Sequence, residues 1–590
     1  MDQIIRWAVA ALLGLVFVGL TFNRISRTAT ESGLPYSLFG DIQDSVIGTV
    51  NGLWPWIRTR PVAPSPTLRP NQTTPHHHHR QFVPLSPNLT TCHLSYSRQV
   101  LPVYCCPPKP ESEEPFIDFE FPDPETHRVR IRRPVHKLDR AFISKYQKAL
   151  AKMKSLPLND PRNFMRQANI HCIFCTGAYN QMHSNSPLNI HRSWLFFPFH
   201  RMMIYFHERI LASFMDDGDD FALPYWNWDN PEGMLLPKMY MNGSFFDTER
   251  DQSHVYPSVA DINFGGVESG LSDKDQIETN LRFMYHQMIS GAKRTELFMG
   301  CAYRSGENGS CNGPGTIELA PHNALHTWVG SNLNPQRENM GTFYAAARDP
   351  VFYAHHSNID RLWEVWRDLN EHKLDIHDPE WLDSHFFFHD EKLRLVRIRI
   401  RDVLNISKLG YAYEPIDHAW VNARPMPSMP PNIARQILQQ KKQQTLQYFV
   451  QKQDFGPKGR RLSTNVRLEV ERPKKQRSRE EKIREEEVLV VYGIEVVRDV
   501  YAKFDVFVNA VNVNTIGAES REFAGTFVNV QKGVRHVKKR SSPAILKLGI
   551  SELLEDLEAD EDESIFVTLV PRGGTGENIF VGGVRIEYIH

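Results

Sequence analysis

The chain has 590 residues, and its 69 Lys+Arg residues equal its 69 Asp+Glu residues, so the formal net charge at pH 7 is zero. This balance argues against nucleic-acid binding, which relies on a basic surplus to displace counterions from phosphates. With 41% hydrophobic residues the chain can build a sizeable core and is not a wholly disordered protein. Its 7 Cys are too few for a disulfide scaffold, whereas its 25 His indicate where the chemistry lies.

The amino terminus is predicted to be a targeting segment. Residues Trp7–Phe22 form an uncharged, almost wholly apolar run, with Arg6 before it and Arg24 after it, as in a secretory signal. We expect residues 1–30 to be a signal sequence or an uncleaved signal anchor, and any membrane attachment is then confined to residues 4–22. Five N-x-S/T sequons agree with passage through a glycosylating compartment: Asn71, Asn88, Asn242, Asn308 and Asn405.

Composition and periodicity divide the rest of the chain. Residues 31–85 are rich in Pro and include the run His76–His79, which is typical of an extended linker. Hydrophobic periodicity predicts helices over about residues 142–153, 193–215, 322–328 and 355–366. After a Pro- and Gln-rich linker over residues 421–461 the period changes to two. The expected strands are Val466–Val470, Phe504–Val508, Phe566–Val570 and Phe580–Tyr588.

The charged run Arg472–Glu487 lies between these strands, and we expect it to be a solvated loop because acidic and basic residues alternate along it. The chain is therefore expected to contain a mainly α domain over residues 86–420 and a smaller all-β, sandwich-like domain over residues 462–590.

Two clusters of histidines lie in the predicted helical domain. His322 and His326 are spaced i,i+4, which places both imidazoles on one face of a helix, close enough to share a metal ion. One of His355 and His356, about thirty residues further on, can complete a three-histidine site. The second cluster consists of His171, His191 and His200, with His183 and His207 as alternatives.

The ligand types favour copper. A zinc peptidase would place Glu directly after the first His of the i,i+4 pair, where this chain has Asn323. Six neutral imidazoles without a carboxylate suit copper better than magnesium, calcium or manganese. Three histidines per ion leave an open coordination position on each, so two copper ions could together bind O₂. Such a two-electron step matches the oxidation of a catechol to an o-quinone.

The chain resembles the plant polyphenol oxidases of the type-3 copper family, which includes catechol oxidase and tyrosinase. The resemblance extends over residues 86–590 and implies a mainly α catalytic domain, built as a four-helix bundle around a dicopper site, followed by the β domain. It rests on four motifs: Asn169–Cys175 (NIHCIFC), His191–His200 (HRSWLFFPFH), Pro321–Trp328 (PHNALHTW) and Asp349–Trp363 (DPVFYAHHSNIDRLW).

The resemblance also implies the ligands and cross-links of the two copper ions. The first ion would be held by His171, His191 and His200, and the second by His322, His326 and His356, with His355 as a neighbour. Cys175 would form a thioether with His191. Two disulfides would join Cys92 to Cys106 and Cys105 to Cys172. Cys301 and Cys311 lie outside the family pattern, and a third bridge between them is an open alternative.

Further residues are assigned by the same resemblance. Glu318 would orient a water near the copper ions, Asn323 would help that water deprotonate a monophenol, and Phe343 would form a gate above the second copper. Tyr411 and Tyr413 match a tyrosine motif at the end of the catalytic domain, and we expect Arg133 to be their partner.

The predicted protein is thus an oxidase of o-diphenols that uses O₂, with hydroxylation of monophenols as an additional hypothesis. The C-terminal domain would cover the copper site in a latent proenzyme, and a protease would activate it by cleavage within residues 421–461. An O₂-binding protein without catalysis and a specialised phenol hydroxylase or aurone-forming enzyme are the alternatives. The N-terminal segment favours the secretory pathway and the vacuole lumen, with the plastid thylakoid lumen as the alternative.

Overall fold

The computed structural model describes residues 83–94, 104–108, 115–123, 125, 128–306, 309, 311–444, 453–497, 500–531 and 543–590. All of them belong to one compact unit, which spans residues 81–590. The predicted targeting segment and most of the Pro-rich linker lie outside these residues. Among the helices of the described residues, none is both long enough and apolar enough to cross a membrane.

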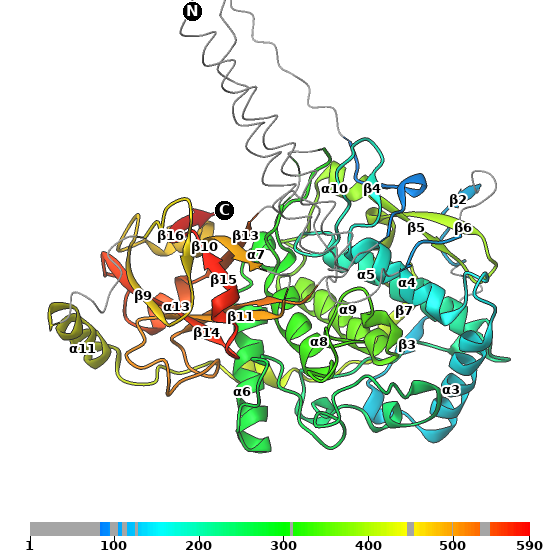
Figure 1. Cartoon of the computed structure of the whole chain (residues 1–590), viewed down its shortest axis with the longest axis horizontal. Helices are drawn as coiled ribbons and strands as arrows, with labels where there is room; N and C mark the ends of the chain where they lie inside the picture. Colours follow the sequence, from blue (N-terminus) through cyan, green and yellow to red (C-terminus); the bar gives the residue numbers. More distant parts are fainter. Residues whose placement is uncertain are drawn as a thin grey trace, which may run out of the picture. The chain divides into compact units, whose positions relative to one another are not determined.

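Four helices form the centre of the helical domain, residues 86–420 (Figure 1). They are α4 (Phe164–Cys175), α5 (Phe196–Ala212), α8 (Asn323–Val329) and α9 (Val351–Leu369). Helices α5 and α9 pack against each other. Side chains on all sides of α5 are buried from Phe196 to Glu208, which is typical of a helix in the middle of a large core. The mainly α bundle expected for this domain is confirmed.

Helix α3 (Arg140–Ser155) buries Tyr146, Ala149, Leu150 and Met153 on one face, as its periodicity predicts. Helix α4, in contrast, was not predicted. It buries eight of its twelve residues, so the sequence shows no clear polar face and no strong period of 3.6. The remaining helices of the domain are α6 (Asp273–Tyr285), α7 (Thr295–Met299) and α10 (Pro379–Asp383).

Three small sheets support the bundle. Strands β2 (Phe116–Asp118), β6 (Leu395–Arg399) and β5 (His385–His389) form one of them. The parallel pair of β3 (Arg130–Arg132) and β7 (Tyr411–Tyr413) joins the start of the domain to its end. The antiparallel pair is β1 (Pro87–Asn88) and β4 (Asn180–Gln181).

The C-terminal domain consists of two antiparallel sheets, as the period-two pattern predicts. One sheet has the order β12-β11-β14-β9, and the other has the order β13-β10-β15-β8 with β16 also paired to β10. Apolar side chains from both sheets, such as Leu468, Phe504, Leu546 and Leu569, form a common core. The strands are β8 (Arg460–Arg461), β9 (Val466–Glu471), β10 (Glu486–Val496), β11 (Ala502–Val508), β12 (Phe523–Asn529), β13 (Ala544–Gly549), β14 (Ser564–Arg572), β15 (Ile579–Val581) and β16 (Gly583–Ile589).

The prediction of a solvated loop over the charged run holds for most of its middle, where residues 473–476, 478–480 and 483–484 are exposed, but not for its ends. Arg472 and Glu487 at its two ends are buried and form a bidentate ion pair, with distances of 2.8 and 2.9 Å. The Arg472 guanidinium also donates to the carbonyls of Ala559, Asp560 and Asp562. Burial is possible because each charge is paired and hydrogen-bonded. Between these ends the chain forms helix α12 (Arg479–Arg484), and helix α13 (Ser551–Asp556) lies further on.

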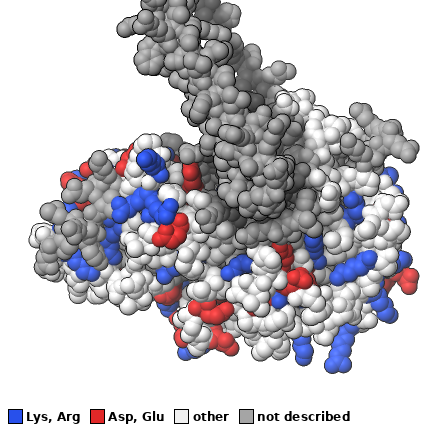
Figure 2. All heavy atoms as spheres, in the orientation of Figure 1, with Lys and Arg blue, Asp and Glu red and all other residues white. Residues whose placement is uncertain are grey.

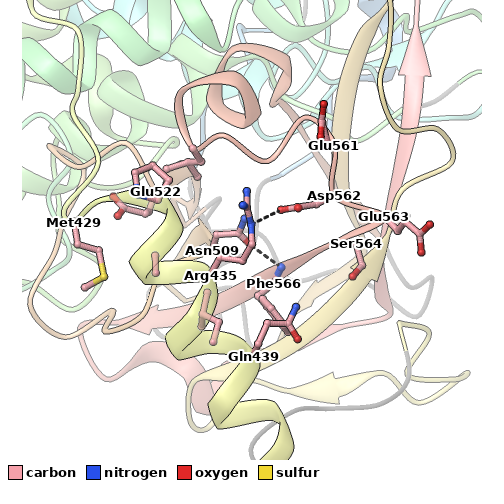
Figure 3. Close-up of a pocket in the computed structure, with 14 residues that line it drawn as sticks. Met429, Arg435, Gln439, Asn509, Glu522, Glu561, Asp562, Glu563, Ser564 and Phe566 are labelled. Atoms are coloured by element: carbon pink, nitrogen blue, oxygen red, sulfur yellow. Dashed lines mark hydrogen bonds and ion pairs between the residues drawn. The ribbon is translucent and has the colours of Figure 1, made fainter.

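The segment predicted to link the two domains contains helix α11 (Pro431–Gln444). This helix lies on the C-terminal domain, where Lys442 pairs with Glu469 at 2.6 Å and Lys441 donates to the carbonyl of Val511 at 3.2 Å. A pocket of about 310 Å³ lies beside α11. In this pocket Arg435 points towards Asp562 (Figure 3). Figure 2 shows Lys and Arg side chains interspersed with Asp and Glu on the visible face of the molecule.

Candidate metal centre

Two groups of buried side chains meet between the four central helices. The first group contains His171 and Cys175 of α4, His200 of α5, and His191 from the loop before α5; one ligand atom of each lies within 4.8 Å of the others. The second group meets the same distance limit and consists of His322, His326, His355 and His356. The groups are adjacent, since the rings of His200 and His356 stack with centroids 4.2 Å apart.

Main-chain carbonyls orient four of these imidazoles. Because a carbonyl only accepts hydrogen bonds, each Nδ1 that it contacts carries the hydrogen and each Nε2 carries a lone pair. The Nδ1–H of His171 donates to the carbonyl of Phe343 (2.8 Å), and that of His200 donates to the carbonyl of Phe196 (2.7 Å). The Nδ1–H of His326 donates to the carbonyl of Met340 (2.7 Å), and that of His322 donates to the carbonyl of Glu318 (3.2 Å). This arrangement is the one that metal-ligating histidines use to fix their tautomer.

The chemistry of the donor set fits metal ions. Within the described residues, the buried Nε2 atoms of His171 and His200 have no hydrogen-bond partner. The Nε2 atoms of His322 and His326 lie 3.1 Å apart, and in this tautomer both present lone pairs, which repel unless a cation lies between them. Burial lowers the pKa of His200 to about 3 and that of His326 to about 4, so these lone pairs are available at neutral pH.

His355 and His356 are distinguished by a hydrogen bond from Trp228. The indole Nε1–H, which can only donate, contacts Nδ1 of His355 at 3.1 Å. A neutral His355 must therefore carry its hydrogen on Nε2, which leaves no lone pair there for a metal. Both ring nitrogens of His356 are buried without a hydrogen-bond partner among the described residues. The geometry thus favours His356 over His355 as a ligand.

The two alternative histidines lie outside both groups. His183 is exposed in the β4 turn. His207 is buried two helical turns beyond His200, where its ring stacks on that of Tyr353 with centroids 3.5 Å apart.

Disulfide bonds connect the chain segments around the first group of histidines. The structure pairs Cys92 with Cys106, Cys105 with Cys172, and Cys301 with Cys311. The second of these bridges ends on α4, one residue after His171. Cys175 is buried and lies among the ligand atoms of the first group.

Glu318, Asn323 and Phe343 all lie beside the histidines. The buried carboxylate of Glu318 accepts the backbone N–H of Arg192 at 2.5 Å. The ring of Phe343 stacks on that of His191, with centroids 4.0 Å apart and an angle of 7°. Oδ1 of Asn323 lies 2.9 Å from Nδ1 of His322.

The partner of the tyrosine motif is Arg132, so the prediction of Arg133 was wrong. The guanidinium of Arg132 lies 3.8 Å from the ring centroid of Tyr411 and donates to the hydroxyl of Tyr413 at 3.0 Å. Arg133 lies over Phe142 instead. Side chains alternate along a strand, and in β3 residues 130 and 132 point into the core, so the inward arginine is one residue earlier than expected.

Sequence reasoning missed the buried ion network beneath the site. Asp360, one turn after His356 on α9, accepts bonds from Arg132, Arg201 and both tyrosine hydroxyls. Arg201 directly follows His200, so the network fixes α5 and α9 next to their histidines. The sequence signals were Arg201 directly after His200 and Asp360 four residues after His356, which places it one helical turn further along the same helix.

Strand β12 of the C-terminal domain covers the histidine site. The carbonyl of Val528 accepts the side-chain amide of Asn323 at 3.2 Å, and Asn529 accepts from the Arg192 guanidinium. Beyond the strand, the carbonyl of Gln531 accepts the N–H of Phe343 at 3.0 Å. The side chains of Val528 and Val530 belong to the same apolar cluster as Phe343. We call residues 523–531 the cover strand.

The chain is similar to known proteins over most of its length. Three family profiles match: the common central domain of tyrosinase (residues 161–369), the polyphenol oxidase middle domain (375–426) and the chloroplastic polyphenol oxidase C-terminal domain (458–588). Aureusidin synthase of Antirrhinum majus is 44% identical over 496 residues, 82% of this chain and 85% of that protein. The chain belongs to the plant polyphenol oxidases of the type-3 copper family. The chloroplastic polyphenol oxidase of Malus domestica is 42% identical over 496 residues, 83% of this chain and 81% of that protein.

Solved structures of polyphenol oxidases agree with this assignment. Latent apple tyrosinase matches with a TM-score of 0.73 and 41% identity over 81% of this chain and 100% of that one. An active aurone synthase matches with a TM-score of 0.53 and 36% identity over 57% of this chain and 100% of that one. This polyphenol oxidase is thus a copper-dependent oxidoreductase with a dinuclear site, which oxidises o-diphenols to o-quinones with O₂ and is made in a latent form.

Proposed function

We propose that His171, His191 and His200 hold one copper ion and that His322, His326 and His356 hold the other. The observation that carries the assignment is the set of Nε2 lone pairs that main-chain carbonyls direct into the two groups. When bound, the copper pair supplies O₂ binding and accepts two electrons from the diphenol. The chain's own contribution is to hold these imidazoles neutral, in one tautomer and away from bulk water.

Metal analysis and turnover test this assignment together. The purified protein should contain about two copper ions per chain and consume O₂ with 4-methylcatechol. His356→Gln should lose about half of the copper and almost all turnover, whereas His355→Gln should retain copper while losing the Trp228 contact. Equal copper loss in both variants would contradict the choice of His356, and copper without catechol turnover would favour an O₂-binding protein.

Hydroxylation of monophenols is the second part of the proposal. Glu318 is fixed by the N–H of Arg192 and begins the turn that leads to His322, while Asn323 adjoins that histidine. A water held between these two side chains could accept the proton of a monophenol. O₂ uptake with the monophenol tyramine tests this step, with a catechol as the positive control. If the catechol reacts quickly but uptake with tyramine equals uptake in buffer alone, the step is refuted.

We also propose that cleavage within residues 421–461 activates the enzyme. The cover strand occupies Asn323, Arg192 and the backbone of Phe343, so a phenol can reach the site only after the C-terminal domain moves away. Limited proteolysis followed by O₂ uptake tests this: turnover should rise with the fraction of cleaved chain, and unchanged turnover in a fully cleaved sample would contradict it.

For localisation we propose the plastid lumen, the alternative considered above, in place of the vacuole. The support is that relatives from Malus domestica and other plants are named chloroplastic. A fluorescent fusion of residues 1–90 in leaf cells tests the proposal, because fluorescence in the vacuole would overturn it.

A further inference from the structure

Arg192 stands between a proposed copper ligand and the cover strand. It directly follows His191, its backbone N–H donates to Glu318 at 2.5 Å, and its carbonyl accepts the N–H of Gly313 at 3.1 Å. Its φ of 65° is unusual for a residue other than Gly. These two bonds hold the backbone in this conformation, so the direction in which the side chain leaves the loop is fixed.

The guanidinium of Arg192 is shared between the two domains. Nη1 donates to Oδ1 of Asn312 in the catalytic domain at 3.0 Å, and Nη2 donates to Oδ1 of Asn529 in the cover strand. The group also lies 5.9 Å from the ring centroid of Phe527. Asn312 directly follows Cys311, whose disulfide to Cys301 ties the loop down.

When the C-terminal domain moves away, the contacts of the two Nη atoms of Arg192 therefore change differently. Nη1 keeps Asn312, because both belong to the catalytic domain, while Nη2 loses the amide oxygen of Asn529. A guanidinium is always charged and presents its donors in a planar fork that matches a carboxylate. Bonds of this kind to a carboxylate are roughly twice as strong as neutral ones.

We infer that Arg192 is a specificity-determining residue, which gives the uncovered enzyme a preference for o-diphenols that carry a carboxylate. In the latent form, Oδ1 of Asn529 occupies the position beside Nη2 of Arg192. After activation, a carboxylate oxygen of the substrate occupies that position. The inference rests on the proposed function, because the phenol ring must react at the adjacent histidine site. It adds a substrate class to that function.

The test compares one acid with its neutral ester on the full chain activated by limited proteolysis. O₂ uptake is measured with 3,4-dihydroxycinnamate and with its methyl ester at pH 7, and the readout is the ratio of the two kcat/KM values. The wild type should favour the acid, and Arg192→Gln should lower the ratio about tenfold, mainly through KM of the acid. Arg192→Lys should recover part of it, and added salt should lower the wild-type ratio.

Arg337→Gln is the matched control. Arg337 also has a left-handed φ, of 59°, and also lies under the C-terminal domain, 5.4 Å from the ring centroid of Tyr501. Its replacement should leave the ratio unchanged. If Arg192→Gln raises the activity of the uncleaved chain but leaves the ratio of the cleaved enzyme unchanged, Arg192 only fastens the cover and the inference is overturned. Absence of turnover with both acid and ester would instead contradict the proposed function itself.

Discussion

Asn323 donates its side-chain amide to the main-chain carbonyl of Val528, with 3.2 Å between Nδ2 and the oxygen. The other end of the same amide lies 2.9 Å from Nδ1 of His322. One side chain thus contacts a proposed copper ligand and the cover strand at once. We therefore expect latency to involve hydrogen bonds to residues beside the proposed copper ligands, and uncovering the site should free the Asn323 donor for a water or a phenol.

The position of the activating cut should determine how far activity rises. Arg424 pairs with Asp556 at 2.7 Å, Ser428 donates to Glu522 at 2.9 Å and Lys442 pairs with Glu469 at 2.6 Å. These contacts fasten the predicted linker to the C-terminal domain. We expect an engineered protease site just before Arg424 to give full activation. A site within residues 445–452 should activate less, because residues 424–444 still hold the cover.

Size-exclusion chromatography and O₂ uptake on the two cleaved samples check this expectation. After the early cut the C-terminal domain should separate from the catalytic domain, and after the late cut the two should elute together. Equal activation by both cuts would show that α11 contributes nothing to retention of the cover.

Asp360 should be essential for the stability of the catalytic domain. Its carboxylate is buried and accepts bonds from Arg132, Arg201 and both tyrosines of the motif. The pairing with these arginines keeps the pKa of Asp360 low in spite of burial. Asp360→Asn removes one carboxylate partner from each arginine and leaves Arg132 with Glu208 and Arg201 with Glu364. It should lower the free energy of unfolding by about 3 kcal/mol, the lower end of the cost of breaking a buried ion pair.

Denaturant unfolding of the copper-loaded protein measures this loss. Asp368→Asn on the same helix is the control, because Asp368 is 73% exposed and pairs with a half-exposed His372. We expect a change below about 0.5 kcal/mol there. Similar losses in both variants would mean that the network adds no stability beyond that of a surface pair.

His207 should make the folded protein sensitive to acid. Burial lowers its pKa from 6.5 to about 3, so between these values the unfolded chain binds a proton that the folded chain does not. The contribution is fully present above about pH 6.5 and is lost progressively as the pH falls towards 3. Relative to His207→Phe, we expect the wild type to lose about 3 kcal/mol more between pH 7 and pH 4.

Denaturant unfolding curves at several pH values check this difference. His207 is preferred to the proposed copper ligands, because copper binding adds its own pH dependence to theirs. If the two proteins lose stability in parallel, His207 is protonated equally in both states.

Cys175 and His191 should be joined by a covalent thioether bond. Both residues belong to the first group of ligand atoms, which lie within 4.8 Å of one another. After reduction and digestion, mass spectrometry should find the two peptides joined, and Cys175→Ser should release them. Separate peptides from the copper-loaded wild type would contradict the thioether. The variant should also bind the first copper more weakly, because His191 lies on a loop and loses its tether.

Much of the site was predictable because its signals are local. His322 and His326 share a helix face whatever the rest of the chain does, since their spacing of four matches the helical period. Period-two strands of the C-terminal domain, such as β11 and β14, are equally local. Cys301 and Cys311 lie ten residues apart, and a bridge between them was an open alternative that the structure supports.

Other features depended on contacts between distant residues. Helix α4 has apolar neighbours on most sides, so its sequence lacks the amphipathic pattern that identifies a surface helix. The inward arginine of β3 is Arg132 because the pairing of β3 with β7 sets which side chains face the core. Arg472 and Glu487 are buried because the fold brings opposite charges together, which a run of mixed charges does not reveal.

The sequence by itself determined that this protein has a histidine-based dinuclear site in a helical domain. The spacing of four pairs His322 with His326, imidazole ligands suit copper better than magnesium, calcium or manganese, and the four motifs that resemble polyphenol oxidases imply the remaining ligands. Only the tertiary structure decided which ring nitrogens face that site and what lies over it. The hydrogen bond from Trp228 sets the tautomer of His355, and the contacts of Val528 and Asn529 place the cover strand on Asn323 and Arg192. These bonds join residues more than a hundred positions apart, so no local pattern encodes them.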